Sequence, residues 1–305
     1  YHVVEDDSDF DYLVATPWFY VNREAFYDFL ERTPGHITVM YGCHEAIAPD
    51  FMLFDYYIGL DTVPGSDRTV KLPYLRHHLQ EVHGGKEGLD AHALLASKTG
   101  FCNFIYANRK SHPNRDAMFH KLSAFRFVNS LGPHLNNTPG DGHRAEDWYA
   151  SSIRMKKPYK FSIAFENAWY PGYTSEKIVT SMLAGTIPIY WGNPDISREF
   201  NSASFINCHD FPTLDAAAAY VQKVDEDDSL WCEIMSRPWK TPEQEARFLE
   251  ETERETAKLY KIFDQSPEEA RRKGDGTWVS YYQRFLKRGH RMQLAWRRLK
   301  NRLRR

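Results

Sequence analysis

Short apolar runs alternate with stretches of helical periodicity along most of this chain. Seven runs bounded by turn residues have the length and composition of buried strands: 12–15, 36–41, 56–60, 101–107, 160–165, 186–191 and 204–207. Helical periodicity falls between several of them, at 23–33, 114–130, 175–184, 214–224 and 242–263. Strands that alternate with helices favour parallel sheets built from βαβ units, so the sequence predicts an α/β fold.

The length of the chain, 305 residues, favours two domains, because single hydrophobic cores stop growing near ~250–300 residues. A polar stretch at 108–113, NRKSHP, is the expected linker. The expected organisation is therefore a first domain at 1–108, a second at 109–265 and a helical tail at 266–305. A strand pattern is already under way in the first segment, so a Rossmann-like first domain would have its opening strand upstream of Tyr1.

The net charge of −2 hides an uneven distribution of charge. Residues 284–305 contain ten basic residues and no acidic one, so the first 283 residues carry about −12. An acidic body of this kind argues against nucleic acid as a partner.

The basic tail has the pattern of an amphipathic helix. Its apolar residues fall on one helical face, with arginine and lysine on the others: Phe285, Met292, Trp296, Leu299 and Leu303. Two interpretations remain open. The tail is either a C-terminal helix packed on the protein or frayed in solvent, or an anchor lying in the plane of an anionic membrane leaflet.

The sequence offers no convincing metal site. The acidic runs at 6–9 and 225–228 are candidates for an Asp-x-Asp pair, but such runs are more often solvated surface. His77, His78 and His83 do not form an HExxH motif. The four cysteines are far apart and lack zinc-ligand spacing, so we expect reduced thiols in or near the core: Cys43, Cys102, Cys208 and Cys232.

The most informative stretch is 159–211, which has the order strand, polar loop, helix and buried strand. Its loop would lie at the carboxyl end of the first strand, where open α/β sheets bind ligands. Thr174 or Ser175 is a suitable N-cap, and Glu176 and Lys177 fall in the first turn. A lysine beside the positive end of a helix is disfavoured unless an anion lies in front of both the lysine and the helix end. Lys177 therefore indicates a phosphate site. The alternative is a solvated lysine that reaches away from the helix.

A second candidate cluster follows the run at 36–41. Glu45 lies in a loop at the carboxyl end of that strand, where a carboxylate could act as a general base. His44 is an equally natural base by its ordinary pKa, and Cys43 could be a nucleophile.

Several of these segments together resemble the α1,3-fucosyltransferases of glycosyltransferase family 10, and look closest to bacterial members that fucosylate lipopolysaccharide. The resemblance covers roughly residues 10–235 and is densest at 159–211. It rests on these motifs: FENxxxxGYxxEK, TIPIYWGxP, SFIN…DF, APDFMLFDYYIGLD, FCNFIYAN…NRDAMFHKL and, more faintly, DFDYLVATP.

The resemblance implies a GT-B fold, in which two Rossmann-like domains face each other across a cleft. The first domain would hold the acceptor and the second GDP-fucose, and transfer would invert the anomeric centre. Glu45 matches the position of the general base. The donor-binding positions of the family correspond to Arg115, Asn167, Tyr173, Glu176 and Lys177.

The same resemblance sets expectations about cofactors and substrates. Arg115, Lys177 and the helix start at Ser175 can stabilise the departing diphosphate, so no cofactor is required and a divalent metal is at most stimulatory. The expected partners are GDP-fucose and a β-galactosyl-N-acetylglucosamine acceptor glycan, fucosylated at the GlcNAc 3-hydroxyl as in Lewis antigens. The alternatives are α1,4 or mixed α1,3/4 linkage, another nucleotide sugar, or a non-catalytic nucleotide-sugar-binding protein.

For location, the resemblance favours the bacterial cytoplasm. The tail would then hold the enzyme at the inner face of the cytoplasmic membrane. If the chain is eukaryotic, the Golgi lumen is the alternative.

Overall fold

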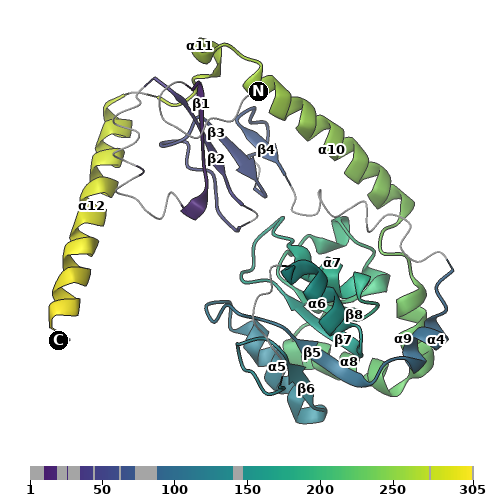
Figure 1. The fold of residues 1–305 in the computed structure, drawn as a ribbon. Helices are drawn as coiled ribbons and strands as arrows, with labels where there is room; N and C mark the ends of the chain where they lie inside the picture. Colours follow the sequence, from purple (N-terminus) through teal and green to yellow (C-terminus); the bar gives the residue numbers. More distant parts are fainter. Residues whose placement is uncertain are drawn as a thin grey trace. The chain divides into compact units, whose positions relative to one another are not determined.

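The computed structural model describes residues 10–18, 26, 35–43, 45–61, 63–72, 88–139, 147–274 and 276–303 (Figure 1). The chain divides into two compact units, each treated by itself below. The first unit combines Tyr1–Leu72 with Glu253–Arg305, and the second is the continuous segment Pro73–Thr252.

The described residues of the first unit form a four-stranded parallel sheet. Its strands occur in the order β1 (Tyr12–Ala15), β2 (Ile37–Tyr41), β3 (Tyr56–Gly59) and β4 (Thr69–Lys71). Alternate side chains of β2 point into two separate clusters. Val39 packs with Ile262 at the end of α10 (Pro242–Phe263), whereas Met40 lies in the cluster reached by α12 (Thr277–Arg302). Helices from the C-terminal segment therefore cover both faces of the N-terminal sheet, as parallel sheets require.

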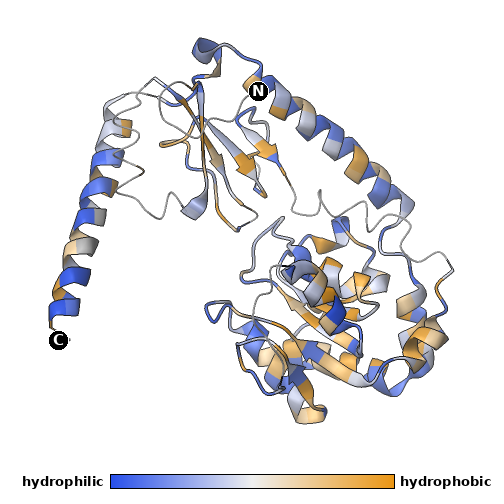
Figure 2. Ribbon diagram, in the orientation of Figure 1, coloured by the Kyte–Doolittle hydropathy of each residue, from blue (hydrophilic) through white to orange (hydrophobic). Residues whose placement is uncertain are grey.

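In the second unit, the part of the chain that the structure describes forms a five-stranded parallel sheet. The strand order is β6-β5-β7-β8-β9. The strands are β5 (Gly100–Phe104), β6 (Val128–Ser130), β7 (Tyr159–Phe165), β8 (Ile187–Trp191) and β9 (Ile206–Asn207). The central strands β7 and β8 are almost wholly buried, and Figure 2 shows their hydrophobic colouring.

Helices bury both faces of this second sheet. One core cluster joins Phe161 and Ile163 of β7 to α5 (Asn114–Phe125), α8 (Leu214–Glu226) and α9 (Asp228–Ser236). The other joins Ala164 and Tyr190 to α7 (Glu176–Leu183). The remaining helical elements are α4 (Ala91–Ala96), α6 (Trp148–Lys156), α11 (Pro267–Ala270), η2 (Ile196–Arg198), η3 (Ser202–Ser204) and η4 (Cys208–Asp210).

The expected α/β class with parallel sheets is confirmed, but the expected domain boundary at 108/109 is wrong. Strand β5 belongs to the second sheet, where Cys102 pairs with Phe161 of β7 and with Val128 of β6. The stretch 108–113 is therefore the loop from β5 to α5 inside the second unit and not a linker. Residues from Glu253 onward return to the first unit, so the tail is not a separate module.

Two expected helices also differ from the structure. The helix expected at 114–130 ends at Phe125, because the backbone is extended at Arg126 and continues into β6. The helix expected at 23–33 lies outside the described residues except for Phe26, which is buried against Phe54.

The acidic run at 225–228 is not simply a solvated surface. Asp225 is buried, and its carboxylate lies 3.0 Å from Nζ of Lys160 and 2.9 Å from Nη1 of Arg126. Asp227 caps α9, since its side chain accepts from the amide of Leu230 at 3.0 Å. These two carboxylates have structural partners, and the acidic run at 6–9 lies outside the described residues.

Three further features concern sulfur, metals and membranes. All four cysteines are free thiols, as expected, and three of them are buried. Among the described residues, no three His, Cys, Asp or Glu side chains gather closely enough to hold a metal ion. Within the same ranges, no helix combines the length and apolar content that crossing a bilayer requires.

Asp55 holds the C-terminal segment against the first sheet. Its Oδ2 accepts from the amide and hydroxyl of Thr38 on β2, at 2.8 and 2.9 Å. Its Oδ1 accepts from the amides of Arg272 and Lys273, which follow α11. Burial alone would raise the pKa of Asp55, but these hydrogen bonds and the charge of Lys273 lower it below its ordinary value.

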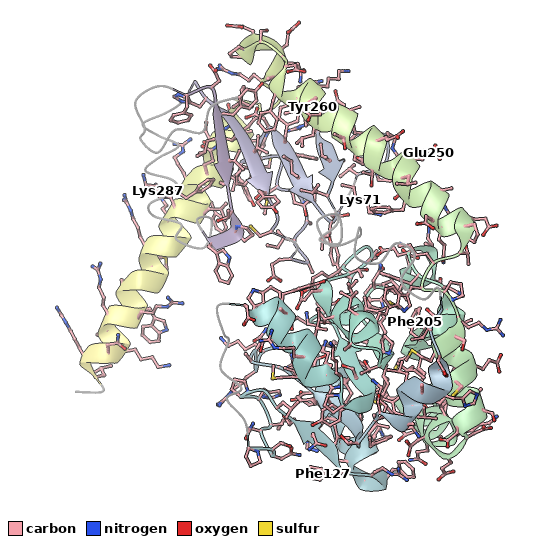
Figure 3. All side chains as sticks on the ribbon, turned by 45° about the vertical axis from the view of Figure 1, so that its right-hand side comes forward. Lys71, Phe127, Phe205, Glu250, Tyr260 and Lys287 are labelled. Carbon is pink, nitrogen blue, oxygen red and sulfur yellow. The ribbon has the colours of Figure 1, made fainter. Side chains whose placement is uncertain are left out.

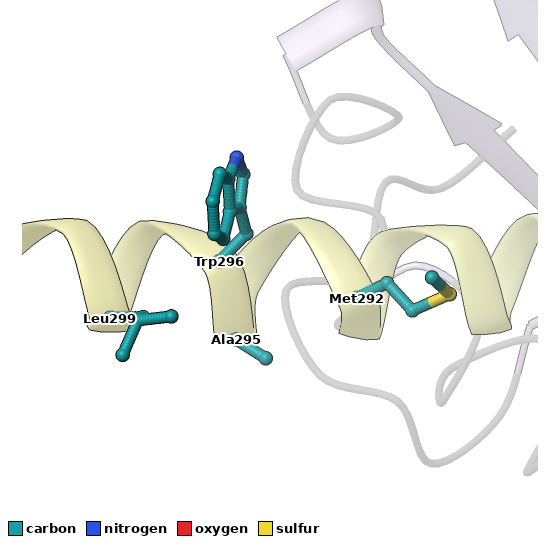
Figure 4. A pocket seen from close by; sticks show the side chains of 4 residues that line it. All are labelled: Met292, Ala295, Trp296 and Leu299. Carbon is teal, nitrogen blue, oxygen red and sulfur yellow. The ribbon is translucent and has the colours of Figure 1, made fainter.

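The tail helix α12 packs on the first unit at its start and is exposed further along. Tyr282 and Leu286 contact the cluster of Met40 and Phe54, and the Tyr282 hydroxyl donates to Oδ2 of Asp50 at 3.0 Å. Farther along, Met292 is 73% exposed and Trp296 is 68% exposed. With Ala295 and Leu299 they line an apolar hollow of about 520 Å³ (Figure 4).

The start of the tail helix therefore packs on the protein, as one of the two interpretations expects, whereas its later part is exposed. Basic side chains such as Lys287 extend from it (Figure 3), and membrane binding stays a prediction.

We predict that Asp55→Asn lowers the free energy of unfolding of the first unit by about 1–3 kcal/mol at pH 7, because an amide cannot accept all of these bonds as an ion does. The folded-state pKa is depressed, so this stabilisation is present above the unfolded pKa and disappears as the pH falls through the folded pKa. Urea unfolding, monitored by hydrogen exchange of the amides in β2 and β3, measures this loss of unfolding free energy.

Asp67→Asn is the matched control. Asp67 also pairs with Arg272 but is exposed, so its loss should cost less than about 1 kcal/mol. Equal losses for the two variants would show that Asp55 has no special structural role.

Candidate functional site

A buried carboxylate follows β7 at the carboxyl end of the second sheet. The amide of Glu166 donates to the carbonyl of Trp191 at 2.8 Å and so extends the pairing with β8. The Glu166 side chain is 0% exposed. Its Oε1 accepts from the amide of Ser175 at 2.8 Å, and its Oε2 accepts from the Ser175 hydroxyl at 2.7 Å. Glu166 thus caps α7, whose N-cap residue Ser175 makes no side-chain capping bond of its own.

Lys177 turns back toward this carboxylate and does not reach away into solvent. Its Nζ lies 3.1 Å from Oε2 of Glu166, 2.8 Å from Oγ of Ser175 and 3.7 Å from Oε1 of Glu176. The side chain of Lys177 remains 17% exposed. The anion that a lysine at this helix end requires is therefore provided by the chain itself, in Glu166.

The charges of this group shift one another. Burial alone would lower the pKa of Lys177, but the carboxylates of Glu166 and Glu176 hold it well above its ordinary value. Burial raises the pKa of Glu166 against the effect of Lys177. For Glu176, the charge of Lys177 outweighs burial, and the pKa is lowered. The group therefore keeps a permanent ammonium ion beside the start of α7.

Arg115 and Asn167 meet at the same end of the sheet. Arg115 is fully buried in the first turn of α5, and its Nη2 donates to the carbonyl of Asn108 at 2.6 Å. Its Nη1 lies 3.4 Å from Oδ1 of Asn167, and its guanidinium lies 4.4 Å from the ring centre of Tyr106. The pKa of Tyr106 is raised by burial, while the charges of both Lys177 and Arg115 act to lower it. The ammonium of Lys177 and the guanidinium of Arg115 therefore both lie close enough to Tyr106 to affect its pKa.

The loop between β7 and α7 is fixed by Asn193. Its Oδ1 accepts from the amide of Gly172 at 2.9 Å, and its Nδ2 donates to the Thr174 hydroxyl at 3.0 Å. Between these two points Tyr173 is buried, and its carbonyl accepts from the Tyr190 hydroxyl at 3.3 Å. Tyr173 therefore lies in the loop that leads from β7 to Lys177 and influences the pKa of that lysine.

A second buried lysine supports α7 from behind. Nζ of Lys156, the last residue of α6, donates to the hydroxyls of Thr180 and Ser181 at 2.6 and 3.2 Å, and lies 3.4 Å from the carbonyl of Lys177. Burial lowers the pKa of Lys156 to about 7. Nothing in the sequence distinguishes Lys156, since a lysine near the end of a helix is an ordinary surface residue.

The first unit holds Glu45 in a tight turn after β2. The amide of Glu45 donates to the carbonyl of Gly42 at 3.0 Å, and the Tyr57 hydroxyl donates to the carbonyl of Ile47 at 2.8 Å. Cys43 has a φ of +48°, which non-glycine residues rarely adopt. Burial and the charge of Glu45 raise the pKa of Cys43, so the structure argues against a thiolate nucleophile there.

Of the other candidates, His44 lies outside the described residues. Glu45 and the five donor-side candidates belong to different units.

The structure thus links all five expected donor-side residues through contacts or electrostatic interactions: Arg115, Asn167, Tyr173, Glu176 and Lys177. Sequence reasoning missed Glu166, Tyr106, Asn193 and Lys156 as parts of this site. For Glu166 a signal existed, because Lys177 needed an anion and Glu166 is the first residue after the strand. Tyr106 also follows its strand closely, but its aromatic side chain is typical of a core.

Comparisons with known proteins agree with this geometry. The family model described as Glycosyltransferase family 10 (fucosyltransferase) C-term matches residues 95–271, more than half of the chain. The chain belongs to glycosyltransferase family 10. The matched segment includes β5, β7 and α7 and all five donor-side residues.

Individual relatives of this family 10 chain are similar over part of its length. It is 29% identical over 238 residues to the Alpha-(1,3)-fucosyltransferase FucT of Helicobacter pylori, covering 68% of this chain and 48% of that protein. It is 31% identical over 190 residues to a putative fucosyltransferase of Acanthamoeba polyphaga mimivirus, covering 61% and 31%. The family 10 chain therefore spans about half or less of the length of these two relatives.

Solved structures support the expected fold. A crystal structure of alpha1,3-fucosyltransferase with GDP matches at a TM-score of 0.61 and 25% identity, covering 78% of this chain and 73% of that one. The structure with GDP-fucose matches at 0.60 and 25%, covering 77% and 72%. The GT-B class expected from the sequence is confirmed by these neighbours and by the two parallel sheets.

We predict that Gly192→Ala lowers the free energy of unfolding of the second unit by about 2–4 kcal/mol. Gly192 has a φ of +152°, and an added Cβ would lie 2.5 Å from both Cβ and Cγ of Glu166. Amide exchange in β7 and β8 during urea unfolding measures the loss. Gly185→Ala is the control, because it has a φ of +65° but meets mainly the tips of Leu94, so about 1 kcal/mol is expected. A Gly192→Ala loss no larger than this would contradict the packing of Glu166 against β8.

Proposed function

We propose that this protein is an inverting α1,3-fucosyltransferase. It transfers L-fucose from GDP-β-L-fucose to the 3-hydroxyl of GlcNAc in N-acetyllactosamine-type acceptors, including lipopolysaccharide glycans of the Lewis type. The observation that carries the proposal is the gathering of the five donor-side residues at the carboxyl ends of β5 and β7, within the segment matched by the family. Its similarity to structures described with GDP and GDP-fucose supports the choice of donor.

On the donor side, the reaction breaks the bond between fucose C1 and the β-phosphate oxygen. Negative charge develops on GDP as it departs, and fixed cations lower the free energy of that transition state. Lys177, which is 17% exposed, would act on the phosphate as a point charge. Arg115 is fully buried, so its guanidinium would stabilise the diphosphate through its positive charge from behind. Glu176 would accept hydrogen bonds from hydroxyls of the fucose. Because these groups supply the positive charge, a divalent metal would be at most stimulatory.

On the acceptor side, Glu45 would act as the general base. The acceptor oxygen attacks C1 from the face opposite the leaving GDP, so the β-linked donor gives an α-linked product. The proton of the acceptor hydroxyl passes to the Glu45 carboxylate, a transfer typically worth ~10²–10⁴-fold in rate. The tight turn that holds Glu45 restricts its position, which is what a positioned base requires.

We also propose a location at the inner face of the bacterial cytoplasmic membrane. The exposed part of α12 presents Met292 and Trp296 among basic residues, and the tail contains no acidic residue after Arg284. Apolar side chains inserted at the headgroup boundary, together with ~1 kcal/mol per nearby basic residue, would hold the helix on anionic lipid. This location would bring the enzyme to lipid-linked acceptor glycans.

The activity is tested with GDP-fucose and soluble N-acetyllactosamine, with GDP release and product linkage as readouts. We predict that Glu45→Gln lowers turnover ~10²–10⁴-fold while calorimetry shows unchanged GDP affinity, because only proton transfer is lost. His44→Gln is the control and should retain turnover. A product linked α1,4, activity only with another nucleotide sugar, or no turnover of any donor would each refute the proposed reaction. Loss of turnover in His44→Gln alone would move the base to His44.

We predict that removal of residues 290–305 abolishes binding to phosphatidylglycerol vesicles and leaves activity on the soluble acceptor within about twofold. This truncation keeps Tyr282 and Leu286, which pack on the first unit. Two full-length variants separate the contributions, one with Met292→Gln and Trp296→Gln, the other with Arg291→Gln and Arg298→Gln. Vesicle flotation in neutral and anionic lipid measures each. Unchanged flotation of the truncated chain would exclude the tail as the anchor.

A further inference from the structure

Glu166 is a fully buried charged residue, and the proposed reaction gives it no role. Its carboxylate oxygens bind the start of α7, through the amide and hydroxyl of Ser175 and the ammonium of Lys177. An ion without exposure to water is costly unless its partners satisfy it, so this carboxylate is retained at a free-energy cost. Because the carboxylate lies beside Lys177, a proposed donor-binding cation, this cost indicates that Glu166 has a function there.

Several independent features fix where the Glu166 carboxylate lies. Its backbone amide is bound to the carbonyl of Trp191, so the residue continues the β7–β8 ladder. Gly192 leaves room for its Cβ and Cγ, where any other side chain would collide. Ser175 is held from both its amide and its hydroxyl, and the same hydroxyl lies 2.8 Å from Nζ of Lys177. The ammonium is therefore held by two adjacent, rigid acceptors.

The neighbouring lysine shows what burial does without such a partner. The ammonium of Lys156, on α6, lies 3.4 Å from the backbone carbonyl of Lys177 on α7, and both side chains are largely withdrawn from water. The Lys156 ammonium contacts two hydroxyls and a carbonyl, and burial lowers its pKa to about 7. Lys177 has a carboxylate in direct contact, and its pKa is raised well above the ordinary value in spite of burial. The contact with a carboxylate is the evident difference between the two sites.

We propose that Glu166 is a positioning residue, which holds the Lys177 ammonium as a fixed, permanently charged contact for the diphosphate of the donor. This inference rests on the proposed role of Lys177 in binding GDP-fucose. The carboxylate shares the ammonium with the incoming phosphate and does not itself touch the donor. The ionisable groups that act on Lys177 are Glu166 after β7, Glu176 on α7, Tyr173 in the loop and Tyr106 after β5; Lys156 on α6 lies behind.

The experiment measures GDP affinity by calorimetry from pH 6.5 to 9.5 on the full chain. In Glu166→Gln only one carboxylate, that of Glu176 at 3.7 Å, still offsets the burial of Lys177, so the pKa of Lys177 falls and the side chain loses its proton as the pH rises. We expect the affinity of this variant, relative to wild type, to fall at least tenfold between pH 6.5 and 9.5. The titration of GDP itself cancels in that ratio. Glu166→Asp retains the charge, and its ratio to wild type should be constant across the range.

A merely structural role for Glu166 would lower affinity by the same factor at every pH, and that result would overturn the proposal. Ser175→Ala is the matched control for the loss of a hydrogen bond, since it removes a contact to both Glu166 and Lys177 but leaves the carboxylate. Its ratio to wild type should not depend on pH. In a Lys177→Met background, Glu166→Gln should add no pH-dependent loss.

Two further outcomes separate this inference from the proposed function. If Lys177→Met leaves GDP affinity unchanged, Lys177 does not bind the donor and both fail. If Lys177→Met weakens GDP binding but Glu166→Gln lowers the GDP affinity by the same factor at every pH, only the positioning role is refuted. Should Glu166→Gln not fold, the side-chain nitrogen resonances of wild type decide: Lys177 should stay protonated through pH 9.5 while Lys156 titrates near neutrality. Titration of Lys177 below pH 9 would refute the proposal.

Discussion

The buried ion pair between Glu166 and Lys177 is the interaction on which the second unit's site depends. It joins the end of the central strand β7 to the start of α7, so strand, loop and helix share one electrostatic junction. Glu166 replaces the missing side-chain cap of the helix and neutralises a cation that the helix dipole would repel. The remaining donor-side residues are arranged around this junction through Tyr106 and the loop fixed by Asn193.

Local pattern was sufficient to predict much of the fold. The strand Tyr12–Ala15 and the helix Pro242–Phe263 were predicted to the residue, because each is a continuous periodic segment with clear ends. The domain boundary was not predictable in this way. It depends on which sheet β5 joins, and that choice is made by pairing with β7, more than fifty residues later in the chain. Likewise, periodicity does not show that Asp225 is buried between Lys160 and Arg126.

For the side chains of the site too, local sequence pattern predicts some features and not others. The five donor-side positions came from motif resemblance, and the structure links them; it does not test their roles. Lys177 was recognised as anomalous from its helix position alone, yet its partner required the three-dimensional path of the loop to identify. Lys156 could not have been found, since only tertiary packing converts an ordinary helical lysine into a buried one.

The first unit is built from two segments separated by the whole of the second. Its sheet forms from residues that leave the ribosome early, but Ile262, Ala270 and the amides that bind Asp55 are synthesised some two hundred residues later. The second unit is continuous and can complete its core while the N-terminal strands still have one face uncovered. During synthesis the N-terminal sheet must therefore persist as an unfinished structure with exposed apolar surface. The first unit is therefore completed only after the whole of the second unit has been synthesised.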